Sequence, residues 1–396
     1  MPETWIPRTA EAVFTGSEPA LELFPVWLLL GPRQVGKSSL LRRCAREDRQ
    51  FVDLDDLDVR TRAQRDPVLF ARDLRPPVLI DEIQYAPKLL SAVKRIADSG
   101  VPPGSIWLTG SQNFEVMTGV RESLAGRVAI LHLYGLSDEE KSLETRDPAA
   151  YFDALCDSTF PRLHGIDDSN ARALYLSSYT STYIERDVRE LLGIEKRREF
   201  EVFVKMCALR TGQLVNHADL ARDAGISPAT ARTWLGVLED SFLIRLVHPY
   251  FKSRSKRLVK SPKLYFLDMG LAAHLAGWRD SEMLRLGPQA GAAFETHVFG
   301  NILRHFRHRA RDVEIHLWRT RDGDEIDFLV EVGGACYPIE VKMSTPDARD
   351  LVALGRIRDA RWQRGTILAL ARLGDPEPAT VHADWVARGP EELPFA

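Results

Sequence analysis

The sequence contains few cysteines, and their spacing excludes two common ways of stabilising a small domain. The four cysteines, Cys44, Cys156, Cys207 and Cys336, are widely separated and form no CxxC pair. Neither a cysteine-based zinc site nor a disulfide framework is therefore indicated. We expect such a chain to work in the reducing environment of the cytoplasm.

The sequence also lacks a strong charge of one sign and any long apolar run. It has 53 Lys and Arg residues against 56 Asp and Glu residues, a net charge of −3. Any contact with nucleic acid must therefore come from a local basic patch. The longest apolar run, Val26–Leu30, is far below the roughly 20 residues of a membrane-spanning helix. The first residues show no basic stretch followed by an apolar one, so we expect no signal peptide.

The pattern of apolar runs predicts an α/β architecture. With 396 residues and 44% hydrophobic content, the chain is long enough for two to three globular domains. Short apolar runs that alternate with helical stretches predict a doubly wound parallel sheet sandwiched by helices. The predicted strands of this sheet are 26–30, 50–54, 77–80, 105–109 and 128–133.

A phosphate-binding motif follows the first predicted strand. Gly31–Ser38 reads GPRQVGKS, which fits G-x-x-x-x-G-K-[ST], and a predicted helix begins at Ser38. In this motif the backbone amides surround the phosphates, Lys37 contacts the β and γ phosphates, and Ser38 binds Mg²⁺. The predicted ATP-binding residues are Gly31, Pro32, Arg33, Gln34, Val35, Gly36, Lys37, Ser38 and Ser39.

Two acidic residues end the third predicted strand. The sequence Pro77–Glu82 reads PVLIDE, so an apolar strand carries Asp81 and Glu82 to the carboxyl edge of the sheet, beside the phosphates. We expect Asp81 to hold the Mg²⁺ shell and Glu82 to polarise the attacking water.

Polar and basic residues after the fourth strand are further candidates. Thr109, Ser111 and Gln112 are each placed to sense the γ-phosphate, and the sequence does not choose among them. Arg121 and Arg127 lie in RESLAGR, where one arginine can act across a subunit interface of a homo-oligomer. Ordinary surface ion pairs are the alternative interpretation.

These motifs, in this order and spacing, resemble the prokaryotic AAA+-related ATPases of the AAA_14 type, which carry a C-terminal DUF4143 region. The motifs are GPRQVGKS, LIDEIQ, LTGS and SLAGR. The resemblance covers essentially the whole chain, and it implies an ATPase that binds ATP and Mg²⁺.

The segment Val215–Glu239 fits a helix-turn-helix. Gly225 suits the turn, Ser227 the cap of the second helix, and Pro228 its first position. The shared core is predicted to contain Leu220, Ala224, Ile226, Ala231 and Leu235.

A basic segment between two predicted strands extends this motif to a winged helix. The strands are Phe242–Val247 and Leu264–Leu267, and on the second helix Arg232 and Thr233 are expected to face outward. The basic residues 252–263 suit non-specific phosphate contact with DNA or RNA, while a protein-binding module is the alternative. They are Lys252, Arg254, Lys256, Arg257, Lys260 and Lys263.

Acidic residues and a lysine stand out near the C-terminus. Glu295 lies in a predicted helix, Asp327 in a predicted strand, and Glu340 and Lys342 in the next strand. Residues two apart in a strand share one face, so Glu340 and Lys342 point together. Glu325 shares the face of Asp327 and is a weaker candidate.

This helix with three strands, a second helix and a last strand resembles the PD-(D/E)xK nuclease fold. The resemblance implies that Asp327, Glu340 and Glu295 bind Mg²⁺ or Mn²⁺, with Lys342 orienting water or stabilising charge. Arg319 is a candidate for phosphate contact. A solvated acidic edge without a metal is the alternative.

Four domains are therefore expected: an ATPase core (1–136), a helical lid or linker (137–200), a winged helix-turn-helix (201–267) and a C-terminal α/β domain like restriction endonucleases (268–396). Three hypotheses follow: an ATP-dependent enzyme acting on DNA with a metal-dependent nuclease, a nucleotide-switched binding or regulatory ATPase with an inactive nuclease-like scaffold, and an ATPase that remodels proteins.

Overall fold

The computed structural model describes most of the chain. The described residues are 5–16, 18–111, 120, 123–143, 145–188, 196–250, 261–278, 280–319, 325–346, 362–375, 379–382, 385–388 and 391–395. The chain divides into two compact units. The first contains Met1–Leu136, Asp240–Phe242 and Phe306–Arg311, and the remaining residues form the second. Among the described residues, no helix combines the length and hydropathy needed to cross a membrane.

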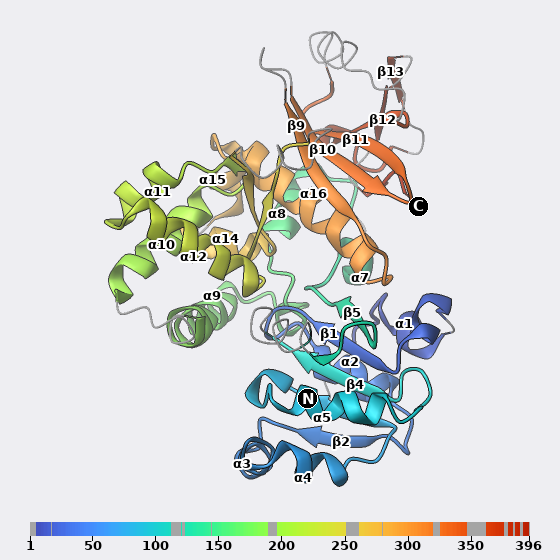
Figure 1. Ribbon diagram of the computed structural model, residues 1–396. Coiled ribbons are helices and arrows are strands. Elements are labelled where there is room, and N and C mark those ends of the chain that lie inside the picture. The colour runs from blue at the N-terminus through green and yellow to red at the C-terminus, as the bar shows by residue number, and fades with distance from the viewer. Residues whose placement is uncertain are drawn as a thin grey trace. The chain divides into compact units, whose positions relative to one another are not determined.

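The first unit is built on a five-stranded parallel sheet flanked by helices (Figure 1). The strand order is β2-β3-β4-β1-β5, and the α/β prediction for this part of the chain is confirmed. Every predicted strand is present to within one residue at each end. The strands are β1 (Val26–Leu30), β2 (Gln50–Asp53), β3 (Val78–Asp81), β4 (Ile106–Gly110) and β5 (Val128–His132).

The apolar runs form strands because their side chains can be buried on both faces of a parallel sheet covered by helices. Leu28, Leu30, Ile80 and Leu108 are fully buried, and Trp27 stacks on Trp107 at 5.8 Å between ring centroids. The helices of this unit are α1 (Glu11–Thr15), η1 (Pro19–Leu23), α2 (Lys37–Cys44), α3 (Leu57–Arg65), α4 (Pro67–Arg72), η2 (Ile83–Tyr85) and α5 (Leu89–Ala97).

The second unit begins with a helical stretch, as predicted for the residues after Ser137. Its elements are α7 (Asp138–Lys141), α8 (Pro148–Cys156), η3 (Pro161–Leu163), α9 (Ser169–Tyr179), the π-helical η4 (Thr180–Val188) and α10 (Arg197–Leu209). Ser137 and Glu140 form a reciprocal cap at the start of α7. This pairing satisfies two backbone amides that the helix itself leaves free.

Two short helices follow, as the helix-turn-helix pattern predicts. Helix α11 (His217–Ala224) ends at Gly225, which adopts φ 68°, and helix α12 (Pro228–Asp240) begins after Ser227. The Ser227 hydroxyl accepts a hydrogen bond from the amide of Thr230 at 3.1 Å, as a helix cap does. Four of the five predicted core residues are buried, and Ile226 is only half-buried.

A three-stranded antiparallel sheet accompanies these helices. Its order is β6-β8-β7, formed by β6 (Gln213–Leu214), β7 (Ile244–Val247) and β8 (Lys263–Phe266). The tip residues 252–260 lie outside the described residues. Lys263 is described, and it corrects the prediction of a solvent-facing tip lysine. It lies within β8 and is 7% exposed.

The C-terminal part contains a six-stranded mixed sheet of order β13-β14-β12-β11-β10-β9. Strands β9, β10 and β11 form antiparallel pairs, whereas β12 pairs with β11 in parallel. The helix predicted between β11 and β12 falls largely on residues 347–361, outside the described residues. The prediction of one strand after it was too low, since β13 and β14 follow β12.

The remaining elements of the second unit complete this part. They are α14 (Met269–Ala276), α15 (Ser281–Leu286), α16 (Ala290–Arg307), β9 (Glu314–Arg319), β10 (Glu325–Val332), β11 (Ala335–Lys342), β12 (Gly365–Ala369), η5 (Leu370–Arg372), β13 (Ala379–His382) and β14 (Trp385–Arg388). Phe299 of α16 and Phe328 of β10 pack with ring centroids 5.9 Å apart. This contact holds the helix against the sheet.

Candidate nucleotide site and carboxylate cluster

The loop between β1 and α2 has the backbone of a phosphate-binding loop. Gly31 has φ 154°, and a Cβ atom there would lie 1.9 Å from the carbonyl oxygen of Leu133. Gln34 and Gly36 have φ 66° and 91°, in the left-handed region. At position 31 only glycine fits, because a side chain would collide with the Leu133 carbonyl group. At position 36 glycine avoids the strain that a left-handed φ imposes on other residues. Ser39 is exposed on the first turn of α2.

Lys37 lies folded against this loop. Its Nζ donates hydrogen bonds to the carbonyl oxygens of Gly31 at 3.0 Å and Pro32 at 2.8 Å, and it is 5% exposed. Burial lowers the pKa of Lys37 to about 8, although Glu82 and Asp81 act in the opposite direction. Phosphate oxygens would be stronger partners than these two carbonyl groups because their charge is opposite.

A buried arginine supports the same loop. Arg8 donates hydrogen bonds of 2.8 Å to the carbonyl oxygens of Val35 and Tyr134, and it is 6% exposed. Arg8 was not predicted from the sequence, because no local motif marks it. On the loop itself, Arg33 donates to the Tyr85 hydroxyl at 2.9 Å.

The carboxylate of Asp81 accepts hydrogen bonds from two hydroxyl groups, one on helix α2 and one on strand β4. The Ser38 hydroxyl donates to its Oδ1 at 2.8 Å, and the Thr109 hydroxyl donates to the same oxygen. Burial raises the pKa of Asp81, while both hydroxyl bonds lower it. The three residues predicted from separate motifs therefore meet at the carboxyl edge of the sheet, with the donor types that Mg²⁺ prefers.

Glu82 is held beside this group by a second polar network. Its backbone adopts φ 57°, and its amide donates to the Thr109 hydroxyl at 2.9 Å. The Ser111 hydroxyl donates to Glu82 Oε2 at 3.2 Å, and Gln84 donates both to Glu82 and to Ser111 Oγ at 3.0 Å. The Thr109 hydroxyl thus bonds the carboxylate of Asp81, whereas the Ser111 hydroxyl bonds the carboxylate of Glu82, which distinguishes two of the three sensor candidates.

Gln84 was missed in the sequence, although it ends the LIDEIQ motif. It is 4% exposed and bonds both Glu82 and Ser111. Gln112 lies outside the described residues. The available signal was the position of this amide, two residues after Glu82 in a motif at the end of a buried strand. Buried amides are as a rule hydrogen-bonded, so a glutamine placed there is expected to bond the neighbouring polar groups.

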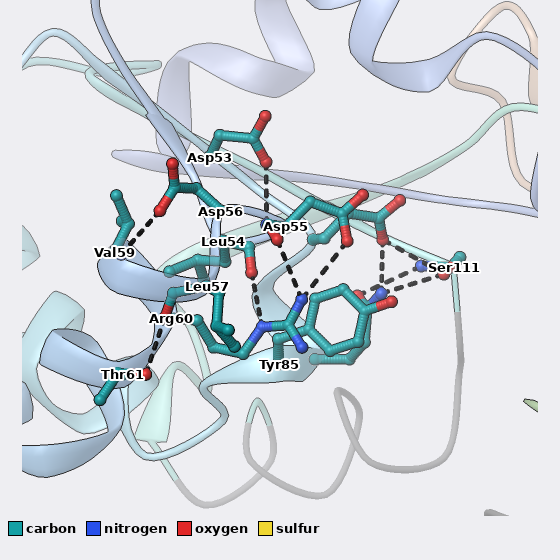
Figure 2. A network of polar contacts seen from close by, with 12 residues as sticks. Asp53, Leu54, Asp55, Asp56, Leu57, Val59, Arg60, Thr61, Tyr85 and Ser111 are labelled. Atoms are coloured by element: carbon teal, nitrogen blue, oxygen red, sulfur yellow. Dashed lines mark hydrogen bonds and ion pairs between the residues drawn. The ribbon is translucent and has the colours of Figure 1, made fainter.

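The segment after Glu82 is anchored to the loop after β2, as Figure 2 shows around Arg60 and Tyr85. The Arg60 guanidinium lies 4.0 Å from the centroid of the Tyr85 ring. Its Nε donates to the carbonyl oxygen of Leu54 at 2.9 Å, and Asp55 lies 3.5 Å from its Nη2. This cation–π contact links helix α3, which follows β2, with η2, which follows β3.

Arg127, a candidate for action across a subunit interface, has local partners. It forms an ion pair with Asp98 and donates to the carbonyl oxygen of Ala125 at 3.0 Å. Both charged groups are partly exposed, so the pair contributes little to stability. Arg121 lies outside the described residues.

In the second unit, the predicted carboxylates gather around a lysine. Lys263 Nζ lies 2.9 Å from Glu295, 2.7 Å from Glu325 and 3.2 Å from Asp327. The prediction that Lys263 contacts phosphate at a wing tip is therefore wrong. The weaker candidate Glu325 belongs to this cluster, and Arg319 Nε lies 3.7 Å from it.

Glu340 and Lys342 point together, as the strand spacing predicts. Lys342 Nζ lies 3.0 Å from Glu340 Oε1. Glu340 Oε2 accepts a bond from the amide of Asp327 at 3.3 Å, and Asp327 Oδ2 accepts one from the amide of Val341 at 3.0 Å. These reciprocal bonds fix the two carboxylates across strands β10 and β11.

The electrostatics of this cluster favour a retained proton and a charged lysine. Burial, followed by the charge of Asp327, raises the pKa of both Glu295 and Glu340 to about 8. Burial acts to lower the pKa of Lys263, but Glu295, Asp327 and Glu325 together raise it above its ordinary value. These neighbouring carboxylates therefore favour the charged form of Lys263.

Three family models match successive parts of the chain. Residues 24–141 match an AAA domain (AAA_14), residues 148–282 a domain of unknown function (DUF8612), and residues 290–373 a domain of unknown function (DUF4143). The AAA domain contains the phosphate-binding loop and both acidic residues of the nucleotide site. The DUF4143 match contains Glu295, Glu325, Asp327, Glu340 and Lys342.

Two curated proteins of mycobacteria are similar over most of the chain. They are the uncharacterized proteins Rv2008c of Mycobacterium tuberculosis and Mb2031c of Mycobacterium bovis. Each is 32% identical over 333 residues, which cover 83% of this chain and 72% of the relative. The crystal structure of protein VC1899 from Vibrio cholerae aligns at 11% identity over 93% of this chain and 94% of that chain, with a TM-score of 0.18.

The nucleotide-site geometry, the order of the matched domains and the extent of the mycobacterial matches agree. The chain belongs to the family of AAA_14-type P-loop proteins with a C-terminal DUF4143 region.

Proposed function

We propose that the protein binds ATP with Mg²⁺ and hydrolyses it to ADP and phosphate. The observation that carries the proposal is the meeting of Ser38, Asp81 and Thr109, with Glu82 bonded alongside. A serine hydroxyl and a carboxylate on one edge of a parallel sheet fit the oxygen chemistry of Mg²⁺. When bound, Mg²⁺ would neutralise charge that develops on the phosphates.

Each residue has a role in this proposal. Lys37 leaves the carbonyl groups of Gly31 and Pro32 and pairs with the β and γ phosphates. Ser38 and Asp81 hold the ion, and Glu82 accepts a proton from the attacking water. Because Ser111 and Gln84 both bond to Glu82, they orient its carboxylate. The test is release of phosphate from ATP by purified protein, which must depend on Mg²⁺ and on Lys37.

We further propose that the protein acts on DNA through its winged helix. Two helices joined at Gly225 and the antiparallel sheet β6-β8-β7 support this assignment. Arg232 and Thr233 are exposed on α12, in keeping with a surface that contacts phosphate. The test is binding of fluorescent duplex and single-stranded DNA at low and at physiological salt. Affinity that falls steeply with salt supports phosphate contact.

A matched variant and an ATPase measurement sharpen this test. Arg232→Ala is expected to weaken DNA binding, while Arg198→Ala, on α10, serves as an exposed control. Stimulation of ATP hydrolysis by DNA would link the two activities. Absence of binding to any DNA, with ATP hydrolysis intact, would instead favour the hypothesis of protein remodelling.

The second candidate function is a nucleotide-switched binding ATPase with a catalytically inactive nuclease-like scaffold. The position of Lys263 among Glu295, Glu325 and Asp327 favours it. A divalent ion such as Mg²⁺ or Mn²⁺ does not fit among carboxylates that already surround an ammonium group. The cluster therefore gives no support to metal-dependent cleavage of DNA, although all four residues of the nuclease pattern are present.

A further inference from the structure

The carboxylate cluster of the second unit already has a complete set of partners for a single positive charge. The ammonium group of Lys263 has three N–H donors, and three carboxylates lie within 2.7–3.2 Å of its nitrogen. The side chain of Lys263 is 8% exposed, against 13% for Glu295 and 12% for Asp327. Buried charges of this kind are found paired, because unpaired ones are strongly disfavoured.

Strand β8 holds Lys263 in this position. Its backbone pairs with Val247 on β7 and with Leu214 on β6, so the lysine lies on the central strand of the sheet. Tyr265, two residues further, faces the same cluster, and its hydroxyl donates to Glu295. The Tyr265 ring stacks on Phe299 at 4.6 Å between centroids. The lysine is thus a fixed element of the fold rather than a surface side chain.

Lys342 is a contrasting lysine in the same part of the sheet. Its ammonium pairs with Glu340 at 3.0 Å, and its side chain is 31% exposed. The two lysines therefore differ in their surroundings: Lys263 is buried among three carboxylates, while Lys342 is more exposed and pairs with Glu340. Only the first occupies the position that a metal bound by Glu295 and Asp327 would need.

We propose that Lys263 is a built-in cation that takes the place of a divalent metal and excludes it from the cluster of Glu295, Glu325 and Asp327. A metal ion brought to the same oxygens would lie next to the ammonium group, and two cations repel strongly at such a distance in a buried site. Removal of the lysine charge leaves three converging carboxylates, which is the oxygen set that Mg²⁺ and Mn²⁺ prefer. This inference is independent of the proposed ATPase function.

The experiment is calorimetric titration of nucleotide-free protein with Mn²⁺, comparing wild type, Lys263→Met and Lys263→Arg. Methionine keeps the approximate length of the side chain and removes its charge, whereas arginine keeps the charge. We expect one Mn²⁺ per chain in Lys263→Met, bound at least about 10-fold more tightly than by the other two proteins. The double variant Lys263→Met/Asp327→Asn is expected to lose this binding, which assigns it to the cluster rather than to the nucleotide site.

Thermal unfolding tests the proposal even if the Lys263→Met variant is less stable than wild type. Lys263→Met leaves buried carboxylates uncompensated, so we expect a lower melting temperature that Mn²⁺ raises again. Wild type is expected to show no such rise. The control Lys342→Met should resemble wild type, because this lysine does not lie among the three carboxylates.

Two results would overturn the proposal. One is that Lys263→Met is folded, as verified by circular dichroism, and yet binds no Mn²⁺. The other needs no lysine variant: Mn²⁺ binding by wild type that Asp327→Asn abolishes would mean that the cluster accepts a metal with Lys263 present. If Lys263→Met does not fold, Lys263→Gln takes its place, and the wild-type comparison with Asp327→Asn still decides.

Discussion

Ser38 donates a 2.8 Å hydrogen bond to Asp81 Oδ1 across 43 positions of sequence. The first residue lies in the first turn of helix α2, and the second ends strand β3, so the fold of the parallel sheet brings them together. The Thr109 hydroxyl, from strand β4, reaches the same oxygen. Ser38 and Asp81 would hold Mg²⁺ at this edge when ATP binds, and the ion would supply positive charge beside the phosphates.

Asp81→Asn is expected to raise the Mg²⁺ concentration needed for half-maximal ATP hydrolysis by at least about 10-fold, because a neutral amide binds a hard cation less well than a carboxylate. Phosphate release measured across a Mg²⁺ titration checks this. Asp53→Asn is the matched control, since Asp53 ends the neighbouring strand opposite Asp81, accepts a hydrogen bond from the amide of Asp55 at 2.9 Å and lies 3.7 Å from Arg42. Equal effects of both variants would contradict the assignment.

The pKa of Lys37 predicts how ATP affinity depends on pH. Because burial lowers this pKa to about 8 in the free protein, Lys37 is charged below pH 8 and increasingly neutral above it. ATP favours the charged form, so affinity is expected to be constant well below pH 8 and to fall above it, by at most about 10-fold per pH unit. Fluorescence titrations of an ATP analogue from neutral pH to about two units above this pKa measure the dependence.

Lys37→Met supplies the control for this dependence. It is expected to bind ATP much more weakly, because the phosphates lose their principal cation, and its weak affinity should not change across the same pH range. A wild-type profile that stays flat over the whole range would show that Lys37 does not titrate as the structure indicates. Unchanged ATP affinity in Lys37→Met would reject the nucleotide site itself.

Glu82→Gln is expected to bind ATP normally and to hydrolyse it about 10²–10⁴-fold more slowly, because the amide cannot accept a proton from water. Gln84→Ala tests the bond that orients Glu82 and should produce a smaller loss in turnover with ATP affinity unchanged. Single-turnover hydrolysis separates these effects from product release. A Glu82→Gln enzyme with the wild-type rate would remove Glu82 from this role.

Arg8→Ala is expected to loosen the phosphate-binding loop. The variant leaves the carbonyl oxygens of Val35 and Tyr134 without their buried donor, which costs about 1–3 kcal/mol for each such group. We therefore expect lower stability of the first unit and weaker ATP binding, measured by urea unfolding and by titration. Arg43→Ala, which removes an exposed arginine paired with Glu11 at 3.5 Å, should have little effect on either.

The first unit could be predicted closely because its signals are local. Each strand of the parallel sheet is a continuous apolar run, and the run itself dictates burial on both faces. Residues that follow such strands meet at one edge, so Ser38 and Asp81 could be placed together without coordinates. The sequence did not choose among Thr109, Ser111 and Gln112, and the structure places Thr109 on Asp81. The role of Arg8 could not be predicted, because its carbonyl partners lie 27, 126 and 127 positions away.

The carboxylate cluster shows why a lysine at the end of a basic run was misinterpreted. In the sequence, Lys263 is the last of a run of basic residues that begins at Lys252. Lysine and arginine side chains are ordinarily exposed, so the same was expected of Lys263. Its actual partners, Glu295, Glu325 and Asp327, lie 32 to 64 positions further along the chain. Strand spacing fixed the pairing of Glu340 with Lys342, but only the assembled fold shows which cation the other acids surround.

The same lysine decides what a cleavage assay should show. We expect wild-type protein to leave linear, circular and single-stranded DNA intact with Mg²⁺ or Mn²⁺, with or without ATP, because Lys263 already pairs with Glu295 and Asp327, two of the three carboxylates that the nuclease resemblance implies as metal ligands. Lys342→Ala should then behave as wild type does in every condition. Cleavage by wild type that disappears in both Lys342→Ala and Asp327→Asn would establish a nuclease, and its dependence on ATP would show whether the nucleotide site controls it. Cleavage that persists in both variants would instead indicate a contaminating enzyme. The assay would then be repeated on protein purified further, and we expect no cleavage by that protein.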